Sequence, residues 1–423
     1  MKLLTDITPL RENPAFRRLW IGNTLSNAGA QMASFANTLQ VWDLTHSTTA
    51  TGALAAAIFI PMLVVALPGG KLADRFDRRK LILVTTTCST AVSVALLLDA
   101  LLAHTAGWLW VIFVLVAIRS ALGSVGQPAR TTIIPALVTP AQLPGAMALN
   151  RVSFQIILIA GPALAGVLTG TTGISGCYLV DALSFGASFY GVARLPRSVA
   201  GQINTRKSLG TERPGAAAIT SGLLFIARNK VLAGTFLADL NATFFALPLS
   251  LFPAINAERF GGDPTVLGSF TAAIGVGRMV TAVLAGPLGR TTRQGAAMLG
   301  AVAVWGAAFA VFAVSPSLWL TLLALGVAGA ADSCTVIYRG IIVQRVTPDE
   351  FRGRVNAADY VVGAGGGQLG SLESGLVGSF TSPVISALIG ALLTIAGTAA
   401  IGAALPAFRE YADPEADGTG RSG

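Results

Sequence analysis

The segment GGKLADRFDRRK, residues 69–80, stands between two long apolar stretches of the chain. The spans that we expect on either side cover 50–74 and 80–103. An α-helix needs roughly 20 apolar residues to cross the hydrocarbon core of a bilayer, and both stretches reach that length. Because lipid offers no partners to backbone N–H and C=O groups, such stretches are expected to be helical. The segment is therefore predicted to be a short basic loop between two membrane-spanning helices.

Apolar stretches of this kind recur along the chain. Of its 423 residues, 53% are hydrophobic and 12% are charged, whereas a soluble domain has roughly 25% charged residues. We expect about twelve spans, with approximate bounds 16–43, 50–74, 80–103, 107–136, 142–171, 175–195, 230–257, 263–288, 296–315, 317–345, 352–380 and 383–405. The Gly- and Ala-rich stretch 212–228 is interpreted as an interfacial helix, since a thirteenth span would break the even number.

Basic residues are concentrated in alternate loops. They lie ahead of span one, between spans two and three, in the central loop, after span eight and between spans ten and eleven, whereas the opposite connections hold only Arg259. This positive-inside distribution predicts a multi-pass protein of the inner (cytoplasmic) membrane with both termini in the cytoplasm. The same rule accounts for the net charge of +9, so we do not expect nucleic-acid binding.

The chain divides near its middle into two similar halves. IIPALVTP at 133–140 is echoed by IIVQRVTP at 341–348, and GKL at 70–72 is echoed by GPL at 286–288. We therefore expect an all-α membrane protein of two pseudo-symmetric six-helix bundles. The expected parts are a bundle at 1–195, a cytoplasmic linker with the interfacial helix at 196–229, a bundle at 230–408 and a disordered tail at 409–423.

The loop sequence also resembles a known family. Residues 69–80 are similar to the major facilitator signature Gly-x-Leu-Ala-Asp-Arg-x-Gly-Arg-Arg/Lys, with Asp77 at the position of the second glycine. This variant resembles the subfamily of enterobactin exporters and macrolide efflux proteins, as do NPAFR at 13–17 and TPDEFRGRVN at 347–356. The resemblance covers roughly 13–405. It implies the major facilitator fold, with the substrate handled between the two halves.

By this resemblance the loop forms a cytoplasmic gate. A glycine permits close helix approach, and the aspartate can cap a neighbouring helix, where the dipole favours an anion. The arginines would complete a latch that is made in one transporter state and broken in the other. The expected gate residues are Gly70, Asp74, Arg75, Arg78 and Arg79. The alternative is that these charges only set the topology.

Two further motifs lie inside expected spans. RSALG at 119–123 resembles the family's Arg-x-x-x-Gly element, and the cost of a cation at a helix centre predicts a buried partner for Arg119. GPALAG at 161–166 resembles the Gly-Pro-x-x-Gly-Gly element of the family's antiporters, where proline and small residues make a close, bendable helix contact. The residues that carry this second resemblance are Gly161, Pro162 and Gly166. Ordinary helix packing is the alternative.

Polar side chains inside spans are candidate pathway residues, because lipid offers them no partners. Asn23, Asn27 and Gln31 recur every four residues and so share one helix face. We assign that face, together with Asn241 in span seven, to the substrate cavity. Hydrogen bonds between helices are the alternative.

Carboxylates inside spans are candidates for proton coupling, because burial in a low dielectric favours the protonated form. The candidates in order of preference are Asp239, Asp332 and Glu373, with Asp359 as a further one. Each could instead be the static partner of an intramembrane arginine, the choices being Arg119, Arg151, Arg278 and Arg339. Asp181 in span six is interpreted as a structural hydrogen-bonding residue near the outer face.

Other chemistries are not indicated by the sequence. It has no phosphate-binding Gly-x-x-x-x-Gly-Lys-Ser/Thr loop, no catalytic constellation and no metal-ligand cluster. We expect no enzyme activity and no cofactor, with the proton motive force as the energy source. The expected function is secondary active transport: a proton-coupled antiporter, a monomer in the bilayer, that exports a small amphipathic siderophore or drug-like antibiotic by alternating access. An importer of a small metabolite is the alternative, ahead of a non-transporting sensor or assembly protein.

Overall fold

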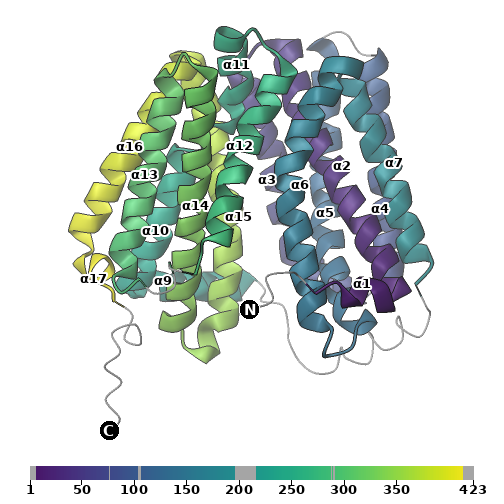
Figure 1. Ribbon diagram of the computed structural model, residues 1–423, viewed down its shortest axis with the longest axis horizontal. Helices are drawn as coiled ribbons and strands as arrows, with labels where there is room; N and C mark the ends of the chain where they lie inside the picture. Colours follow the sequence, from purple (N-terminus) through teal and green to yellow (C-terminus); the bar gives the residue numbers. More distant parts are fainter. Residues whose placement is uncertain are drawn as a thin grey trace. The chain divides into compact units, whose positions relative to one another are not determined.

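A computed structural model describes residues 6–75, 77–102, 106–195, 216–286, 288 and 291–412; the side chains of 66–75 and of a few single positions are outside this description. All regular secondary structure within these ranges is helical. The chain forms two compact units. In Figure 1 the colours run from purple to teal over the first half of the chain and from teal to yellow over the second half. Unit 1 comprises Met1–His46 and Ala57–Arg213, and unit 2 comprises Ser47–Ala56 and Pro214–Gly423.

Unit 1 starts with a short helix and continues with long ones. Their bounds are α1 Thr8–Glu12, α2 Pro14–Thr45, α3 Thr48–Arg75, α4 Arg78–Leu102, η1 Ala106–Trp108, α5 Leu109–Leu137, α6 Leu143–Thr172 and α7 Ile174–Ala193. The motif at 13–17 starts α2. Asn13 Oδ1 accepts hydrogen bonds from the backbone N–H groups of Ala15 (3.1 Å) and Phe16 (3.0 Å), and proline suits the first helical position.

Unit 2 repeats this pattern with one broken span. Its helices are α9 Ala216–Arg228, α10 Lys230–Phe245, η3 Leu249–Leu251, α11 Phe252–Phe260, α12 Pro264–Val283, α13 Gln294–Val314, α14 Leu318–Val346, α15 Asp349–Phe380, α16 Pro383–Ala404 and α17 Pro406–Arg409. The span expected at 230–257 is interrupted after Phe245, because Pro248 cannot continue the backbone ladder. The indole N–H of Trp305 donates to the freed carbonyl of Ala246 at 2.7 Å.

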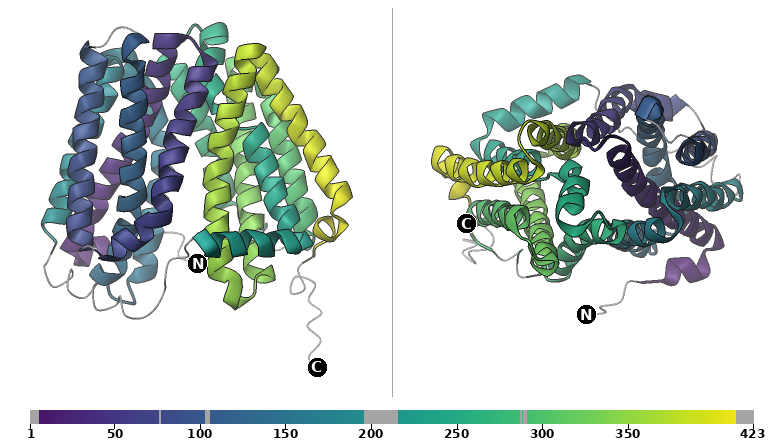
Figure 2. Two further views of the ribbon diagram at one scale, coloured as in Figure 1. Left: turned by 180° about the vertical axis from the view of Figure 1, so that it is seen from behind. Right: turned by 90° about the horizontal axis from the view of Figure 1, so that it is seen from above.

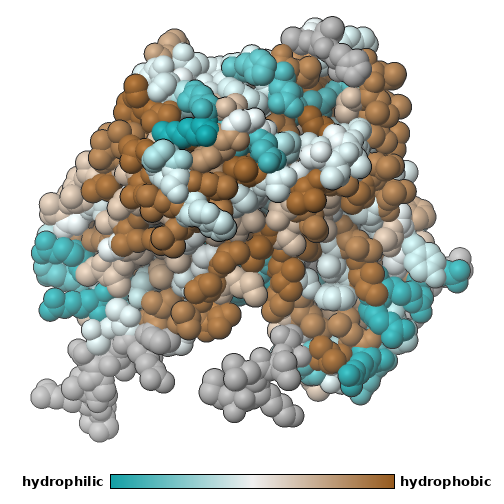
Figure 3. Space-filling model, turned by 45° about the horizontal axis from the view of Figure 1, so that its top comes forward, coloured by the Kyte–Doolittle hydropathy of each residue, from teal (hydrophilic) through white to brown (hydrophobic). Residues whose placement is uncertain are grey.

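The long helices are the membrane-spanning segments. In the described part of the chain, nine of them are long and apolar enough to cross a bilayer by length and composition. The other three, α2, α7 and α15, carry more polar residues and bury many of them, as with Gln40, Asp181 and Ser374. These three helices complete the twelve expected spans. Figure 3 shows hydrophobic residues along the helix flanks and hydrophilic ones gathered toward the ends.

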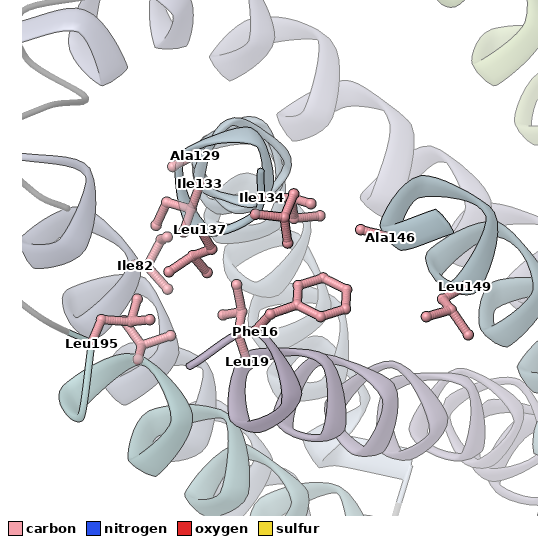
Figure 4. Close-up of a cluster of buried hydrophobic side chains, with 12 residues drawn as sticks. Phe16, Leu19, Ile82, Ala129, Ile133, Ile134, Leu137, Ala146, Leu149 and Leu195 are labelled. Carbon is pink, nitrogen blue, oxygen red and sulfur yellow. The ribbon is translucent and has the colours of Figure 1, made fainter. Parts of the chain in front are cut away.

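The internal echo has a structural counterpart in the cores. In unit 1, Ile134 of α5 is 4% exposed and packs in a cluster with Phe16 and Leu19 of α2 (Figure 4). In unit 2 the equivalent Ile342 of α14 is fully buried in a cluster with Tyr338 and residues of α10 and α13. The repeated isoleucines are therefore core residues that anchor one helix end in each unit.

The stretch 212–228 contains α9, which lies crosswise at the ends of the unit 2 helices (Figure 2). Gly222 contacts the backbone of Arg354, and the rings of Phe225 and Phe351 stack at 4.4 Å between centroids. These contacts attach α9 to the first turns of α15. Residues 196–215 of the expected linker and 413–423 of the expected tail lie outside the described residues.

The first turns of α3 pack within unit 2. The hydroxyl of Thr48 donates to the Gly375 carbonyl at 2.9 Å, and that of Thr51 donates to the Ser250 carbonyl at 2.9 Å. Gly52 faces Gly375 across this contact, where a Cβ on Gly375 would lie 2.9 Å from the Gly52 Cα. Small residues on both helices allow this close approach.

Candidate functional site

The loop at 69–80 is described in part. Asp77 is the N-cap of α4, since its Oδ1 accepts hydrogen bonds from the backbone N–H groups of Arg79 (2.8 Å) and Lys80 (3.2 Å). This explains why an aspartate serves where the family signature has glycine. The Arg79 guanidinium donates to the Ala193 carbonyl at 2.6 Å, at the C-terminal end of α7. Arg78 is half-buried.

The other gate residues lie on the last turns of α3. The side chains of Gly70, Asp74 and Arg75 fall outside the described residues. The latch that we expect from them therefore stays a prediction.

Arg119 of α5 is paired with Asp181 of α7. The Nη1–Oδ2 and Nη2–Oδ1 distances are 2.5 and 2.9 Å, and Asp181 is fully buried. The hydroxyl of Ser93 donates to the same carboxylate at 2.6 Å, and the ring centroid of Phe185 is 5.5 Å from the guanidinium carbon. Asp181 accepts hydrogen bonds from Ser93 and Arg119, as a structural hydrogen-bonding residue would, and the ion pair with Arg119 is what the sequence interpretation did not include.

A half-open cavity of about 130 Å³ lies in unit 1 between α2, α4, α5 and α7. Asn27, Ser89 and Gln127 give it polar walls, and Arg119 and the ring of Phe185 also line it. Of the stripe predicted on span one, Asn27 thus reaches a cavity. The other two residues of that stripe have other contacts: Asn23 with Arg130, and Gln31 with Gly161.

Arg130 of α5 lines the same cavity and has neutral partners. Its Nη1 donates to Asn23 Oδ1 and to Ser188 Oγ, both at 2.8 Å, and its Nη2 donates to Thr86 Oγ1 at 2.7 Å. Asn23 is therefore held by an arginine at the edge of the cavity. Arg130 was not among the residues predicted from the sequence, although an arginine inside the span 107–136 was a visible signal.

The motif at 161–166 makes a close contact between α6 and α2. A Cβ on Gly161 would lie 2.6 Å from the Cβ of Gln31, so only glycine fits there. Pro162 is buried inside α6, and Gly166 is buried one turn further on. Gln31, the third member of the predicted stripe, thus packs on this motif.

We expect Gly161→Ala to destabilise the protein by about 1–3 kcal/mol, as other overpacked contacts do. The matched control is Gly186→Ala, since a Cβ on Gly186 of α7 has no atom within 4 Å. Thermal unfolding of both purified variants measures the effect. Equal melting temperatures for the two would show that the α2–α6 contact relaxes at no cost.

In unit 2, Arg339 of α14 lies between two carboxylates. Asp239 of α10 accepts a hydrogen bond from its Nη1, and Asp359 Oδ1 of α15 is 3.5 Å from its Nε. The side chain of Asp239 is 4% exposed and that of Asp359 is 33% exposed. Two carboxylates thus share one guanidinium, and the group carries a net charge of −1 when both are ionised.

The remaining candidates in unit 2 have separate places. Asp332 of α14 accepts a 2.6 Å hydrogen bond from Arg278 Nε of α12, which makes a neutral pair. Glu373 of α15 is half-buried and has no ion-pair partner in the part of the chain that is described. The amide of Asn241 donates to the Thr394 carbonyl at 2.9 Å, so this side chain ties α10 to α16.

A buried carboxylate in unit 1 also escaped the sequence analysis. Asp99 of α4 is 8% exposed, and its Oδ2 accepts a 2.9 Å hydrogen bond from the Gln40 amide of α2. The Tyr178 hydroxyl of α7 lies 2.7 Å from Gln40 Oε1. Asp99 sits near the end of span three, where an exposed loop residue is the ordinary expectation.

A family model described as transmembrane secretion effector matches residues 4–417. The chain belongs to this family. The enterobactin exporter EntS of Citrobacter koseri is 26% identical over 387 residues, which is 91% of this chain and 90% of the exporter. The enterobactin exporter EntS of Shigella boydii is 26% identical over 385 residues, with the same coverage of 91% and 90%. The resemblance to enterobactin exporters is therefore confirmed.

Solved structures confirm the fold of this chain. A bacterial homologue of the iron transporter ferroportin in an inward-facing state is 16% identical, with a TM-score of 0.68 over 92% of this chain and 98% of that one. The nucleoside transporter NupG is 14% identical, with a TM-score of 0.72 over the same shares. Together with the family match, this fold makes the chain a multi-pass membrane transporter of the major facilitator type, and its relatives are transporters and not enzymes.

Proposed function

We propose that this transporter is a proton-coupled antiporter of the inner membrane with both termini in the cytoplasm. It exports a small amphipathic molecule, a siderophore or a drug-like antibiotic, by alternating access. The protein works as a monomer in the bilayer, without a cofactor, and the proton motive force drives it.

The observation that carries the coupling is the Asp239–Arg339–Asp359 group. One guanidinium neutralises one carboxylate, so the second carboxylate leaves an excess negative charge among membrane helices. Removing a charge from water is costly, and the excess is relieved when one carboxylate takes up a proton. The carboxylate that stays ionised keeps its ion pair with Arg339. Because the three residues come from α10, α14 and α15, proton uptake changes a contact between three helices.

Two features support export of an amphipathic molecule. The curated relatives that match over nine-tenths of the chain are exporters of enterobactin. The α6 motif at 161–166 also resembles the family's antiporter element. Cargo enters from the cytoplasm or the inner leaflet, and it shifts the inward–outward balance by its differential affinity for the two states.

A separate prediction concerns the cytoplasmic gate. If Asp74 is part of a cytoplasmic latch, Asp74→Asn slows the exchange between states, and we expect a transport rate at least about tenfold lower, equivalent to about 1.4 kcal/mol on the barrier. Uptake assays in vesicles measure the rate. Asp77→Asn is the matched control, since asparagine is also a good helix cap and preserves the start of α4. Wild-type rates for Asp74→Asn would rule out the latch.

Reconstituted vesicles test the function itself. The purified protein is placed in liposomes with an imposed pH gradient, and movement of enterobactin is followed together with internal pH. We expect enterobactin and protons to move in opposite directions, and neither movement to occur in protein-free vesicles. Enterobactin movement that ignores the gradient would contradict proton coupling. If enterobactin does not move, release of labelled macrolides is the second arm, and failure of both removes the proposed cargo class.

A further inference from the structure

The cavity of unit 1 holds an excess positive charge. Arg119 is neutralised by two contacts to the fully buried Asp181. Arg130, which lines the same cavity, has among the described residues only the neutral oxygens of Asn23, Thr86 and Ser188 as partners. The lining residues that the structure describes include no acidic side chain. A cation among membrane helices is costly and is expected to have a counter-charge, which the described part of the chain does not supply to Arg130.

Arg130 also has unused donors. A guanidinium has five N–H groups. The three hydrogen bonds use both N–H groups of Nη1 and one of Nη2. The N–H of Nε and the second N–H of Nη2 are left without a protein acceptor among the described residues. Guanidinium groups bind carboxylates and phosphates through such pairs of N–H groups.

The size and walls of the cavity restrict the ligand. Its volume of about 130 Å³ is close to the ~150 Å³ at which an engineered cavity takes up benzene. Phe185 and Leu122 supply apolar walls, while Asn27 and Gln127 supply polar ones. Gly123 leaves open space, since a Cβ there would have no atom within 4 Å. A small ring or chain with one planar anionic group fits this combination better than a fully hydrated inorganic anion.

We propose that this cavity is a subsite for a carboxylate carried by a small apolar group, with Arg130 as its charge partner. The carboxylate accepts hydrogen bonds from the free N–H groups of Arg130, and the apolar group lies toward Phe185. The inference rests on the proposed function only in taking this group to be part of the cargo. The binding itself is measured without transport, so a failure of coupling or of export leaves this test intact.

The test uses two ligands that differ in charge. The full chain in lipid nanodiscs is dialysed to equilibrium against labelled benzoate or labelled benzamide, which have the same ring and a similar shape. We expect benzoate to bind at least about tenfold more tightly than benzamide. Equal binding of the two would overturn the proposal, because the cavity would then not recognise charge.

Variants assign the binding to the cavity. We expect Arg130→Gln to weaken benzoate binding at least about tenfold and to leave benzamide unchanged. Arg151→Gln is the matched control: it removes the same charge from an exposed position of α6, and we expect wild-type binding. Benzoate binding of wild-type strength in Arg130→Gln, or an equal loss in Arg151→Gln, would overturn the assignment.

Two further arms keep the test decisive. If Arg130→Gln does not fold, Gly123→Val fills the cavity without altering its charge and should abolish binding of both ligands; unchanged benzoate binding would overturn the proposal. Inorganic phosphate is added as a competitor to distinguish the two anions that suit an arginine. We expect it to displace benzoate only at about tenfold excess or more. Displacement at lower concentration would make this a phosphate site and remove the carboxylate proposal.

Discussion

Asp181→Ala is expected to lower the free energy of unfolding by about 3–5 kcal/mol, the cost of removing one partner of a buried ion pair. The carboxylate is fully buried and receives hydrogen bonds from Arg119 and Ser93. Its loss leaves the guanidinium of Arg119 charged among α4, α5 and α7 with no carboxylate. The variant is compared with the wild type by unfolding in mixed detergent micelles, followed by helical content.

Two controls separate the buried charge from other effects. Asp349→Asn removes a carboxylate whose side chain is 87% exposed, in a pair with Arg352, and should cost less than about 1 kcal/mol. The double variant Arg119→Met with Asp181→Leu replaces the whole pair by apolar side chains and should recover most of the lost stability. If Asp181→Ala and Asp349→Asn unfold alike, the Arg119 pair does not stabilise the fold.

Asp359→Asn is expected to reduce gradient-driven transport at least about tenfold, equivalent to about 1.4 kcal/mol, while exchange of cargo across the membrane without a gradient continues. The substitution removes the excess negative charge beside Arg339 and leaves the neutral pair of Arg339 with the buried Asp239. A neutral pair has no excess negative charge that the uptake of a proton would relieve. If Asp359→Asn loses gradient-driven transport but keeps exchange without a gradient, Asp359 has a role in coupling and not in holding the fold.

The measurement compares pH-driven accumulation with counterflow in the same vesicles. Asp349→Asn is again the matched control, since it removes a carboxylate from the first turn of the same helix α15 and should leave both activities intact. Normal accumulation by Asp359→Asn would show that the excess charge of this group is not used. Loss of counterflow as well would show that Asp359 has a structural role.

The sequence predicted much of the fold because membranes constrain it strongly. Spans follow from apolar length. The capping of helix starts by Asn13 and Asp77 was not predicted and comes from the structure. The echo at 341–348 indicated two repeated halves, and the structure adds that Ile342 within it is a core residue. The break after Phe245 was the main departure, although Pro248 and Pro253 were visible signals of it.

The candidate sites were predicted less well. The prediction that arginines and aspartates within the spans lie inside the bundles was correct, since they do lie inside the units. Their ion-pair partners could not be predicted from the sequence. An ion pair such as Arg119 with Asp181 joins positions that are 62 residues apart and share no periodicity. Asn241 was predicted to line the cavity from its place in span seven. Its amide instead donates a hydrogen bond to a backbone carbonyl of α16.

Sequence alone determined that this protein is a membrane transporter of two repeated halves, because length, hydropathy, charge asymmetry and motifs are local properties that lipid and the positive-inside rule make decisive. Only the tertiary structure decided which charges neutralise one another. It joined Asp239 and Asp359 to one arginine, and it left Arg130 in a cavity with neutral partners. The reason is physical: the cost of a charge in a low dielectric depends on which groups packing brings within a few ångströms, and helix packing sets that distance.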